Sequence, residues 1–276
     1  QTPSADWLHL YTEASRLAFA DRAQYLGDPD FVAAPGGSWM SLLDPAYLAD
    51  RAKLIAQQPG GQSMKVAPPG VPTGARMAYA PMPDQPEYGT SHISIVDAFG
   101  NAVAMTTTIE GAFGSRQMVR GFLLNSELTD FSFAPADADG KPVANRLQPG
   151  KRPRSSMAPT LVFDKATGQL VMSGGSSGGA LIIHDITKTL YGVLNLGLMP
   201  QQAINLPNFA SFNGPSLLEE KRFSPGTIEA LKARGAEVRE MTMTSGLHAI
   251  TRGQAHGTPL WLGGADPRRE GLVMGD

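Results

Sequence analysis

A run of prolines divides this chain into two parts that must fold in different ways. Between residues 58 and 89 a helix or a central strand is excluded, because each proline lacks a backbone N–H and fixes its own backbone. The prolines are Pro68, Pro69, Pro72, Pro81, Pro83 and Pro86. The segment is therefore predicted to be a long irregular connector, and connectors of this length in compact proteins tend to be functional or cleavable.

Helices are predicted before the connector. Apolar side chains recur at helical spacing between Asp6 and Arg22, which predicts a helix with one buried stripe. The residues of the stripe are Trp7, Leu10, Ala14, Leu17 and Ala18. A second helix is predicted from Pro45 to about Ile55, with Asp44 as the N-cap and the proline at the first helical position.

Strands in hairpins are predicted after the connector. Residues 92–96 and 102–108 read as two strands joined by a turn, and 160–163 and 170–173 form a second such pair. Helices are expected over 183–194 and 225–235, and short strands near 236–240, 248–251 and 259–262. Hairpin strands with helices packed outside them indicate an α+β fold rather than a parallel, Rossmann-type sheet.

Composition sets limits on the class of protein. The chain has 276 residues, 42% of them hydrophobic, which is enough for one large domain or two closely packed ones. A net charge of -2 gives no indication of a nucleic-acid or membrane-surface partner, and no apolar run approaches the roughly 18 residues of a membrane span. Without Cys there is no disulfide or thiol chemistry, and the compartment is not decided. Since the chain opens at Gln1 without an initiator Met or a signal peptide, we interpret it as a processed or truncated product.

Thr90 stands where the connector gives way to the first strand, directly after Gly89. A threonine hydroxyl is a poor nucleophile unless a base takes its proton, and an N-terminal threonine can use its own α-amine, whose pKa is about 8. That amine is freed only if the Gly89–Thr90 bond is cut. Because Gly89 has no Cβ, it tolerates the strained geometry in which the Thr90 hydroxyl attacks the preceding carbonyl. The alternative is an ordinary threonine at the start of a strand.

Blocks along nearly the whole chain carry a resemblance to one family. After the connector these blocks are 90–97, 100–104, 106–108, 113–115, 121–125, 130–132, 151–153, 155–160, 174–179 and 264–268. Together they resemble the small subunit of the gamma-glutamyltranspeptidase family of N-terminal-nucleophile (Ntn) hydrolases, and residues 20–31 resemble the end of its large subunit. The resemblance implies the four-layer αββα fold with antiparallel sheets. It also implies that 1–89 is the C-terminal part of a longer large subunit, and that 90–276 is the catalytic small subunit beginning at Thr90.

The resemblance implies catalytic roles for four residues. Thr90 matches the nucleophile, and Thr108 matches the second threonine, which hydrogen-bonds the nucleophile and supports autoprocessing. Gly178 and Gly179 match the pair that forms the oxyanion hole, which suits backbone N–H groups at the start of a helix. The alternatives are a solvent-facing strand hydroxyl for Thr108 and a flexible helix-entry loop for the glycines.

The resemblance also implies a substrate-binding set. Ser155 and Ser156 match a pair that hydrogen-bonds the substrate α-carboxylate, while Asp130 and Glu127 match positions facing the α-ammonium. An arginine for the α-carboxylate is expected in the missing part of the large subunit. Glu110 departs from the family, whose transpeptidases usually carry Asn there. Two interpretations follow. Either Glu110, Glu127 and Asp130 repel one another and one of them stays protonated, or the acyl group that is recognised differs from γ-glutamyl.

Three further features bear on the site. Residues 134–150 correspond to a region that in some members forms a lid with an aromatic tip; here the absence of Tyr and Trp predicts a short or open lid, which favours hydrolysis. The spacing of four histidines fits no common metal-ligand pattern. These are His92, His184, His248 and His256. Residues 174–179 lack the Lys-Ser/Thr ending of a phosphate-binding loop.

The activity implied by the resemblance is cleavage of γ-glutamyl amides such as glutathione through an acyl-threonine, resolved by water or by an amino-acid or peptide acceptor. No cofactor and no metal are required. The implied partners are a small acyl-amide substrate and the remainder of the large subunit, in a processed heterodimer whose further dimerisation is open, and the implied location is periplasmic or secreted. Two alternatives remain: an acylase of the cephalosporin or glutaryl type, favoured by Glu110, and an unprocessed member without catalysis.

Overall fold

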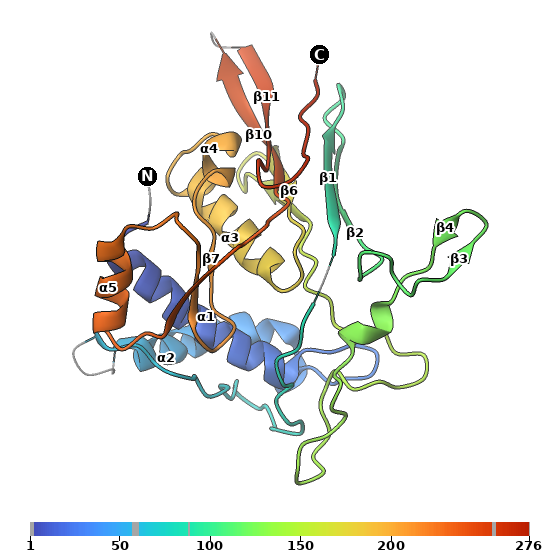
Figure 1. Cartoon of the computed structure of the whole chain (residues 1–276), viewed down its shortest axis with the longest axis vertical. Helices are drawn as coiled ribbons and strands as arrows, with labels where there is room; N and C mark the ends of the chain where they lie inside the picture. Colours follow the sequence, from blue (N-terminus) through green and yellow to red (C-terminus); the bar gives the residue numbers. More distant parts are fainter. Residues whose placement is uncertain (1–2, 57–60, 88, 256–257, 276) are drawn as a thin grey trace. The chain divides into compact units, whose positions relative to one another are not determined.

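The computed structural model describes residues 3–56, 61–87, 89–255 and 258–275 (Figure 1). His256, one of the four histidines named above, lies outside the described residues. The chain forms two compact units that are interleaved in sequence. The first unit comprises Gln1–Gln85, Glu127–Ser155 and Phe209–Met241, and the second comprises Pro86–Ser126, Ser156–Asn208 and Thr242–Asp276. A division of the chain at Gly89–Thr90 concerns a bond to be cut and stays a prediction.

The first unit begins with the two helices that the sequence predicts. Helix α1 spans Ala5–Tyr25 and α2 spans Pro45–Ala56. The Asp44 carboxylate accepts hydrogen bonds from the backbone N–H groups of Ala46 and Tyr47, at 2.9 and 3.1 Å, which confirms it as the N-cap of α2. Among its described residues the unit also contains the 3-10 turns η1 (Pro35–Gly37), η2 (Trp39–Leu43) and η4 (Glu127–Asp130), and helix α5 (Pro225–Ala233).

The predicted buried stripe of α1 is wrong in part. Leu10 is 55% exposed, and Ala14 and Ala18 are also exposed, although Leu17 is buried. The buried face instead carries an ion pair between Glu13 and Arg16, whose atoms lie 2.6 Å apart. Both charges are further satisfied by hydrogen bonds, among them one from the backbone N–H of Met64 to Glu13, which makes a polar buried face tolerable.

A small sheet completes the first unit, with the order β7 (Phe209–Ala210), β8 (Ser216–Glu219) and β9 (Val238–Met241). Strands β8 and β9 pair in parallel, because helix α5 connects them. This parallel pair is an exception to the antiparallel pattern that we predicted. The core here gathers Leu8 of α1 with residues of the sheet and of α5. Its buried members are Leu8, Phe209, Leu218, Phe223, Leu231 and Ala236.

The second unit contains most of the strands. Its first hairpin is β1 (Ser91–Val96) with β2 (Ala102–Thr107), in which Ser91 pairs with Thr107. A four-stranded antiparallel sheet has the order β11-β10-β6-β5. The other elements of the unit are β3 (Met118–Val119), β4 (Phe122–Leu123), β5 (Thr160–Phe163), β6 (Leu170–Gly175), α3 (Leu181–Leu194), α4 (Pro200–Ile204), β10 (His248–Ala255) and β11 (Thr258–Ala265).

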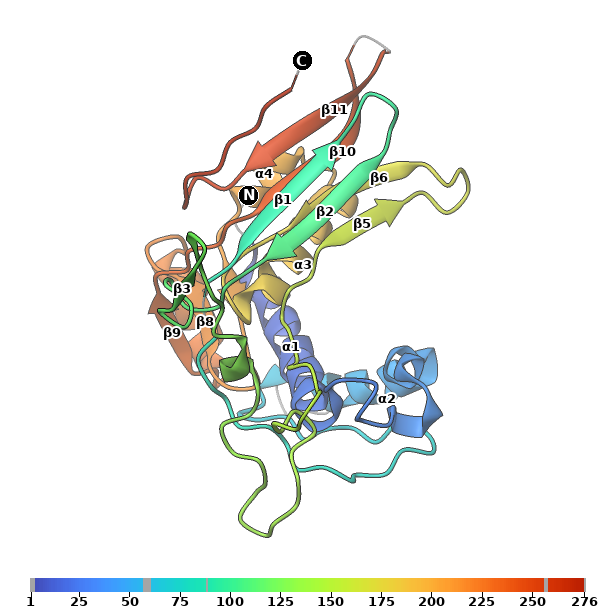
Figure 2. The same ribbon diagram turned by 90° about the vertical axis from the view of Figure 1, so that its right-hand side faces the viewer.

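These elements of the second unit are layered. The β1–β2 hairpin lies against β6 and β10 (Figure 2), while α3 and α4 pack on β6, β10 and β11. The apolar centre between helices and sheet consists of Met172, Ile186, Ile204, Leu247 and Ala249. The unit thus has two facing antiparallel sheets, one of which is covered by helices. This arrangement confirms the predicted α+β class for this unit. No helix among the described residues is long and apolar enough to cross a membrane.

The connector is irregular, as the prolines predict. Among its described residues, Ala80 forms an isolated bridge with Val143, which joins the connector to the segment that we compared with a lid. That segment packs into the first unit, because Val143 and Ala144 are almost fully buried and the Lys151 ammonium donates to the Ala144 carbonyl. The predicted short or open lid concerns a pocket in the assembled site and stays a prediction.

Candidate active site

The bond between Gly89 and Thr90 is surrounded by hydroxyl groups. The Thr90 hydroxyl lies against the carbonyl oxygen of Gly89, and the Thr108 hydroxyl donates to the same oxygen at 3.1 Å. The Thr108 oxygen in turn accepts from the backbone N–H of Glu110 at 2.8 Å, which orients it. The Arg269 guanidinium donates to the Thr90 carbonyl at 3.3 Å. The carbonyl of this bond thus accepts from the Thr108 hydroxyl, with the Thr90 hydroxyl beside it, and a hydrogen bond to its oxygen polarises an amide towards attack.

Gly89 can be only a glycine in this geometry. Its φ of +44° falls in the left-handed region, and a Cβ on it would stand 2.1 Å from the carbonyl oxygen of Glu110. Glu110 itself has a φ of +69° and is 4% exposed. The close approach of these two backbones places Gly89 next to the turn that orients Thr108. The sequence analysis singled out the Glu110 side chain, whereas the structure gives its backbone a direct part in the site.

The loop before α3 carries the predicted oxyanion-hole pair. Gly178 and Gly179 have φ values of +130° and +61°, and Gly179 lies two residues ahead of the first residue of the helix, Leu181. A Cβ on Gly179 would stand 2.5 Å from the carbonyl oxygen of Glu87. The sequence therefore needs glycine at this loop, and the amino end of α3 gives it a positive electrostatic field.

Glu87, three residues ahead of Thr90, occupies this region as well. Its carboxylate accepts a hydrogen bond from the Ser156 hydroxyl at 2.5 Å, and Ser156 is 6% exposed. In the uncut chain the Glu87 carboxylate is therefore hydrogen-bonded to Ser156, one of the two serines predicted to bind a substrate carboxylate. Sequence reasoning missed Glu87, because nothing in its local pattern indicates that the connector returns to the Gly178–Gly179 loop.

The other predicted substrate-binding residues belong to the first unit. Glu127 and Asp130 lie in η4, and both are partly exposed. The backbone carbonyl of Asp130 accepts from the Asn145 amide at 2.7 Å, which ties η4 to the 134–150 segment. Ser155 is exposed at the end of this unit. The structure thus brings Gly89, Thr90, Thr108 and Glu110 together in the second unit. In the same unit Glu87 links Ser156 to the loop of Gly179. Glu127, Asp130 and Ser155 belong to the first unit.

His92 lies on β1, two residues after Thr90, and is 4% exposed. Its ring contacts the hydroxyls of Thr106 and Ser94, at 2.8 and 3.0 Å, and packs so closely on Gly175 that a Cβ there would be 2.4 Å away. Burial, aided by the nearby His248, lowers the pKa of His92 to about 4. The ring is therefore neutral at pH 7. Among the described residues no group of three or more His, Cys, Asp or Glu side chains could hold a metal ion.

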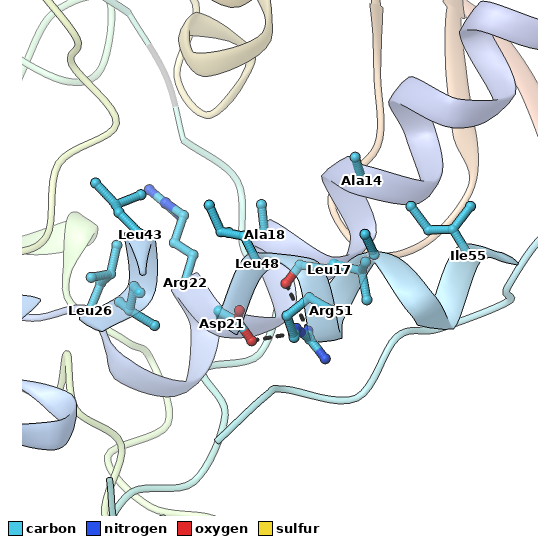
Figure 3. Close-up of a pocket in the computed structure, with 12 residues that line it drawn as sticks. Ala14, Leu17, Ala18, Asp21, Arg22, Leu26, Leu43, Leu48, Arg51 and Ile55 are labelled. Atoms are coloured by element: carbon cyan, nitrogen blue, oxygen red, sulfur yellow. Dashed lines mark hydrogen bonds and ion pairs between the residues drawn. The ribbon is translucent and has the colours of Figure 1, made fainter. Parts of the chain in front are cut away.

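A pocket of about 300 Å³ lies in the first unit between α1 and α2 (Figure 3). Its floor is the ion pair between Asp21 and Arg51, 3.1 Å apart, and Arg51 also donates to the Leu17 carbonyl. Most of the remaining lining is apolar, including Leu43 and Leu48. None of the residues predicted for catalysis lines it, so we do not assign the pocket to the active site.

Comparisons with known proteins identify the family of the chain. The family model for gamma-glutamyltranspeptidase matches residues 1–276. The glutathione hydrolase proenzyme of Escherichia coli (strain K12) is 36% identical over 85% of this chain and 39% of its own length. The acylase ACY 1 proenzyme of Pseudomonas sp. (strain V22) is 29% identical over 96% of this chain and 44% of its own length.

The fold has its counterpart among solved structures. The crystal structure of cephalosporin acylase from Bacillus halodurans superposes with a TM-score of 0.79 and 24% identity, over 99% of this chain and 46% of that chain. The fold is thus that of the Ntn hydrolases, as predicted. Within that class, the chain belongs to the gamma-glutamyltranspeptidase family. It spans less than half the length of each of these three relatives.

Proposed function

We propose that this chain is the catalytic part of an autoprocessing enzyme that cleaves γ-glutamyl amides, such as glutathione, through an ester on Thr90. The observation that carries the proposal is the hydrogen bond from the Thr108 hydroxyl to the carbonyl of Gly89, with the Thr90 hydroxyl next to the same carbonyl. Attack of the Thr90 oxygen on that carbonyl carbon forms an ester as the peptide C–N bond breaks. The proton of the Thr90 hydroxyl passes to the nitrogen, which becomes the free α-amine of Thr90, and water then hydrolyses the ester to the Gly89 carboxylate and the free Thr90 hydroxyl.

The same threonine then acts on substrate. Its α-amine, with an ordinary pKa of about 8, takes the proton of its own hydroxyl, and the oxygen attacks the amide carbonyl carbon. The N–H groups of Gly178 and Gly179 stabilise the negative oxygen that forms. The amine of the substrate leaves with a proton, and the acyl-threonine is resolved by water or by an amino-acid or peptide acceptor.

Substrate recognition is proposed for polar residues of both units. Ser155 and Ser156 hydrogen-bond the α-carboxylate, and the contact between Ser156 and the Glu87 carboxylate supports this role because it is the same chemistry. Glu110, Glu127 and Asp130 face the α-ammonium, where charge-assisted hydrogen bonds are strong. The remainder of the large subunit is the proposed partner in a processed heterodimer, with a periplasmic or secreted location.

A second candidate is an acylase with another acyl specificity. Glu110 favours it, since a carboxylate at this position adds a third negative charge to those of Glu127 and Asp130, and three acids around a single α-ammonium repel one another. The similarity to the acylase ACY 1 proenzyme also supports it. Turnover of a γ-glutamyl anilide against a glutaryl anilide, by the protein expressed from its complete reading frame, separates the two. Faster γ-glutamyl turnover supports the first candidate; exclusive glutaryl turnover overturns it in favour of the second.

A further inference from the structure

A buried acid, Asp185, lies directly behind the Gly178–Gly179 loop. It stands in the second turn of α3 and is 2% exposed, and a Cβ on Gly178 would be 4.0 Å from its Oδ2 atom. No step of the proposed mechanism uses it. The predicted apolar face of α3 did not include it either, so its burial needs another reason.

Asp185 contacts the loop through one hydroxyl. The Ser176 oxygen lies 3.2 Å from Asp185 Oδ2 and 3.1 Å from the carbonyl oxygen of Ser177, and Ser176 is fully buried. The backbone N–H of Gly246 points at the same Ser176 oxygen from 3.4 Å. Since a serine hydroxyl has a single hydrogen, it donates to only one of its two acceptors at a time.

The Ser177 carbonyl belongs to the peptide group whose N–H is that of Gly178. A hydrogen bond to the carbonyl of a peptide group fixes its plane and polarises its N–H, which becomes a stronger donor. The Ser176 hydroxyl therefore acts on one of the two predicted oxyanion donors from behind. The direction of the Ser176 O–H bond depends on Asp185. A protonated Asp185 donates to the Ser176 oxygen, whereas an ionised Asp185 accepts the Ser176 hydrogen.

Charged groups face Asp185 from two elements. Lys188 is on α3 itself, while Asp266 and Arg268 follow β11. The Lys188 ammonium donates to the Asn208 side-chain oxygen at 2.7 Å, and Arg268 pairs with Asp266 at 3.1 Å. The network thus contains two carboxyl groups and two cationic side chains. Burial nevertheless raises the pKa of Asp185 to about 7, against the opposing effects of Lys188 and of the Ser176 hydrogen bond.

We propose that Asp185 is a positioning residue for the oxyanion loop, acting through the Ser176 hydroxyl on the peptide group between Ser177 and Gly178. This inference rests on the proposed function, in which Gly178 stabilises the oxyanion. When Asp185 is protonated it donates to Ser176, and the Ser176 hydrogen turns to the Ser177 carbonyl. When Asp185 is ionised the hydrogen turns to the carboxylate, and the Ser177 carbonyl loses its donor.

The two states of Asp185 can be separated by substitution. Asp185→Asn keeps a donor towards Ser176 at every pH, so it mimics the protonated acid. We expect the ratio of its kcat to that of wild type to lie within about twofold of 1 at pH 6 and to rise severalfold above pH 7, where wild-type Asp185 ionises; the ratio removes the rise in both proteins that follows from deprotonation of the Thr90 α-amine, whose pKa is about 8. Ser176→Ala removes the relay and lowers kcat about tenfold, equivalent to one hydrogen bond of about 1.4 kcal/mol, with KM changed less than about twofold.

Amide hydrogen exchange over residues 176–180 tests the positioning without catalysis. Ser176→Ala should speed exchange there about tenfold, whereas the matched control Asp164→Asn, in the exposed turn between β5 and β6, should change neither exchange nor kcat. Unchanged exchange and kcat in Ser176→Ala, or a ratio of Asp185→Asn kcat to wild-type kcat that does not change with pH, would overturn the inference. A wild-type protein that turns over no amide removes the proposed function instead, and the exchange comparison then still decides the positioning.

Discussion

The hydroxyl of Thr108 donates a hydrogen bond to the carbonyl oxygen of Gly89 across 3.1 Å. Thr108 directly follows the last residue of β2, and Gly89 lies two residues before the first residue of β1. Antiparallel pairing of these strands brings the two residues together, because Ser91 pairs with Thr107. The bond draws electron density from the carbonyl carbon that the Thr90 hydroxyl would attack. The position of Thr108 is thus set by the register of the hairpin.

Removal of the Thr108 hydroxyl should slow self-cleavage. Thr108→Val keeps the size of the side chain and loses the hydrogen bond to Gly89, which is worth about 1–3 kcal/mol at a carbonyl that develops charge, or about 5–160-fold in rate. The rate is read as the loss of full-length chain on denaturing gels. Thr107→Val, on the exposed face of β2, is the control. Equal cleavage rates in the two variants would remove Thr108 from the mechanism.

A methyl group on Gly89 should block the same step. Gly89→Ala faces both a left-handed backbone and a carbonyl oxygen of Glu110 at 2.1 Å from the new Cβ. Gly100→Ala is the matched control, because Gly100 also has a positive φ, +85°, but nothing lies within 4 Å of a Cβ there. We expect Gly100→Ala to cost about 1 kcal/mol of stability and to cleave normally. Cleavage of Gly89→Ala at the Gly100→Ala rate would contradict the close approach.

Burial of His92 should make stability depend on pH. The pKa of His92 is lowered from 6.5 to about 4 in the folded protein. Between pH 6.5 and 4, His92 is therefore protonated in the unfolded chain and neutral in the folded one. Its contribution, about 3 kcal/mol, is fully present above pH 6.5 and is lost as the pH falls to 4. The raised pKa of Asp185 acts in the opposite direction over the same range.

The His92 contribution is therefore measured as a difference between proteins. Urea unfolding of wild type and of His92→Gln at pH 4.5 and 7.5 should show wild type losing about 2–3 kcal/mol more than the variant on acidification. The same loss in both proteins would show that His92 is protonated when folded.

The carboxylate of Glu87 should compete with substrate before cleavage. In the uncleavable Thr90→Ala protein, Ser156 is engaged by Glu87. Adding Glu87→Ala to it frees the serine, and glutamate binding followed by calorimetry should tighten about tenfold or more, since a hydrogen bond to a charged group is worth about 1.5–3 kcal/mol. Unaltered affinity would mean that Ser156 does not bind the ligand carboxylate.

Much of the site was predictable because its residues are local in sequence. Gly89 and Thr90 are adjacent, Gly178 and Gly179 open a helix, and Thr108 ends a hairpin whose turn is evident from residues 97–101. The alternation of β1 and the N-cap at Asp44 are similarly short-range signals. The turns, caps and strands follow from backbone chemistry within a few residues, whereas the roles of Thr90, Thr108, Gly178 and Gly179 follow from the family resemblance and stay predictions.

The unpredicted features depend on approaches between distant segments. Glu87 meets Ser156 because the connector returns to the loop before α3, which no local pattern indicates. Asp185 is buried because it hydrogen-bonds Ser176, although apolar periodicity alone assigns an acid to solvent. The same reason explains α1, where a satisfied ion pair of Glu13 and Arg16 occupies part of the buried face that the sequence predicts to be apolar.

Intact mass under denaturing conditions, on wild type and Thr90→Ala expressed from the complete reading frame, tests the central claim most directly. We predict two fragments for wild type, of which the small subunit begins at Thr90, and a single uncut species for Thr90→Ala. A single uncut species for wild type after prolonged incubation, or cleavage of Thr90→Ala at the same bond, would contradict Thr90 as the processing nucleophile.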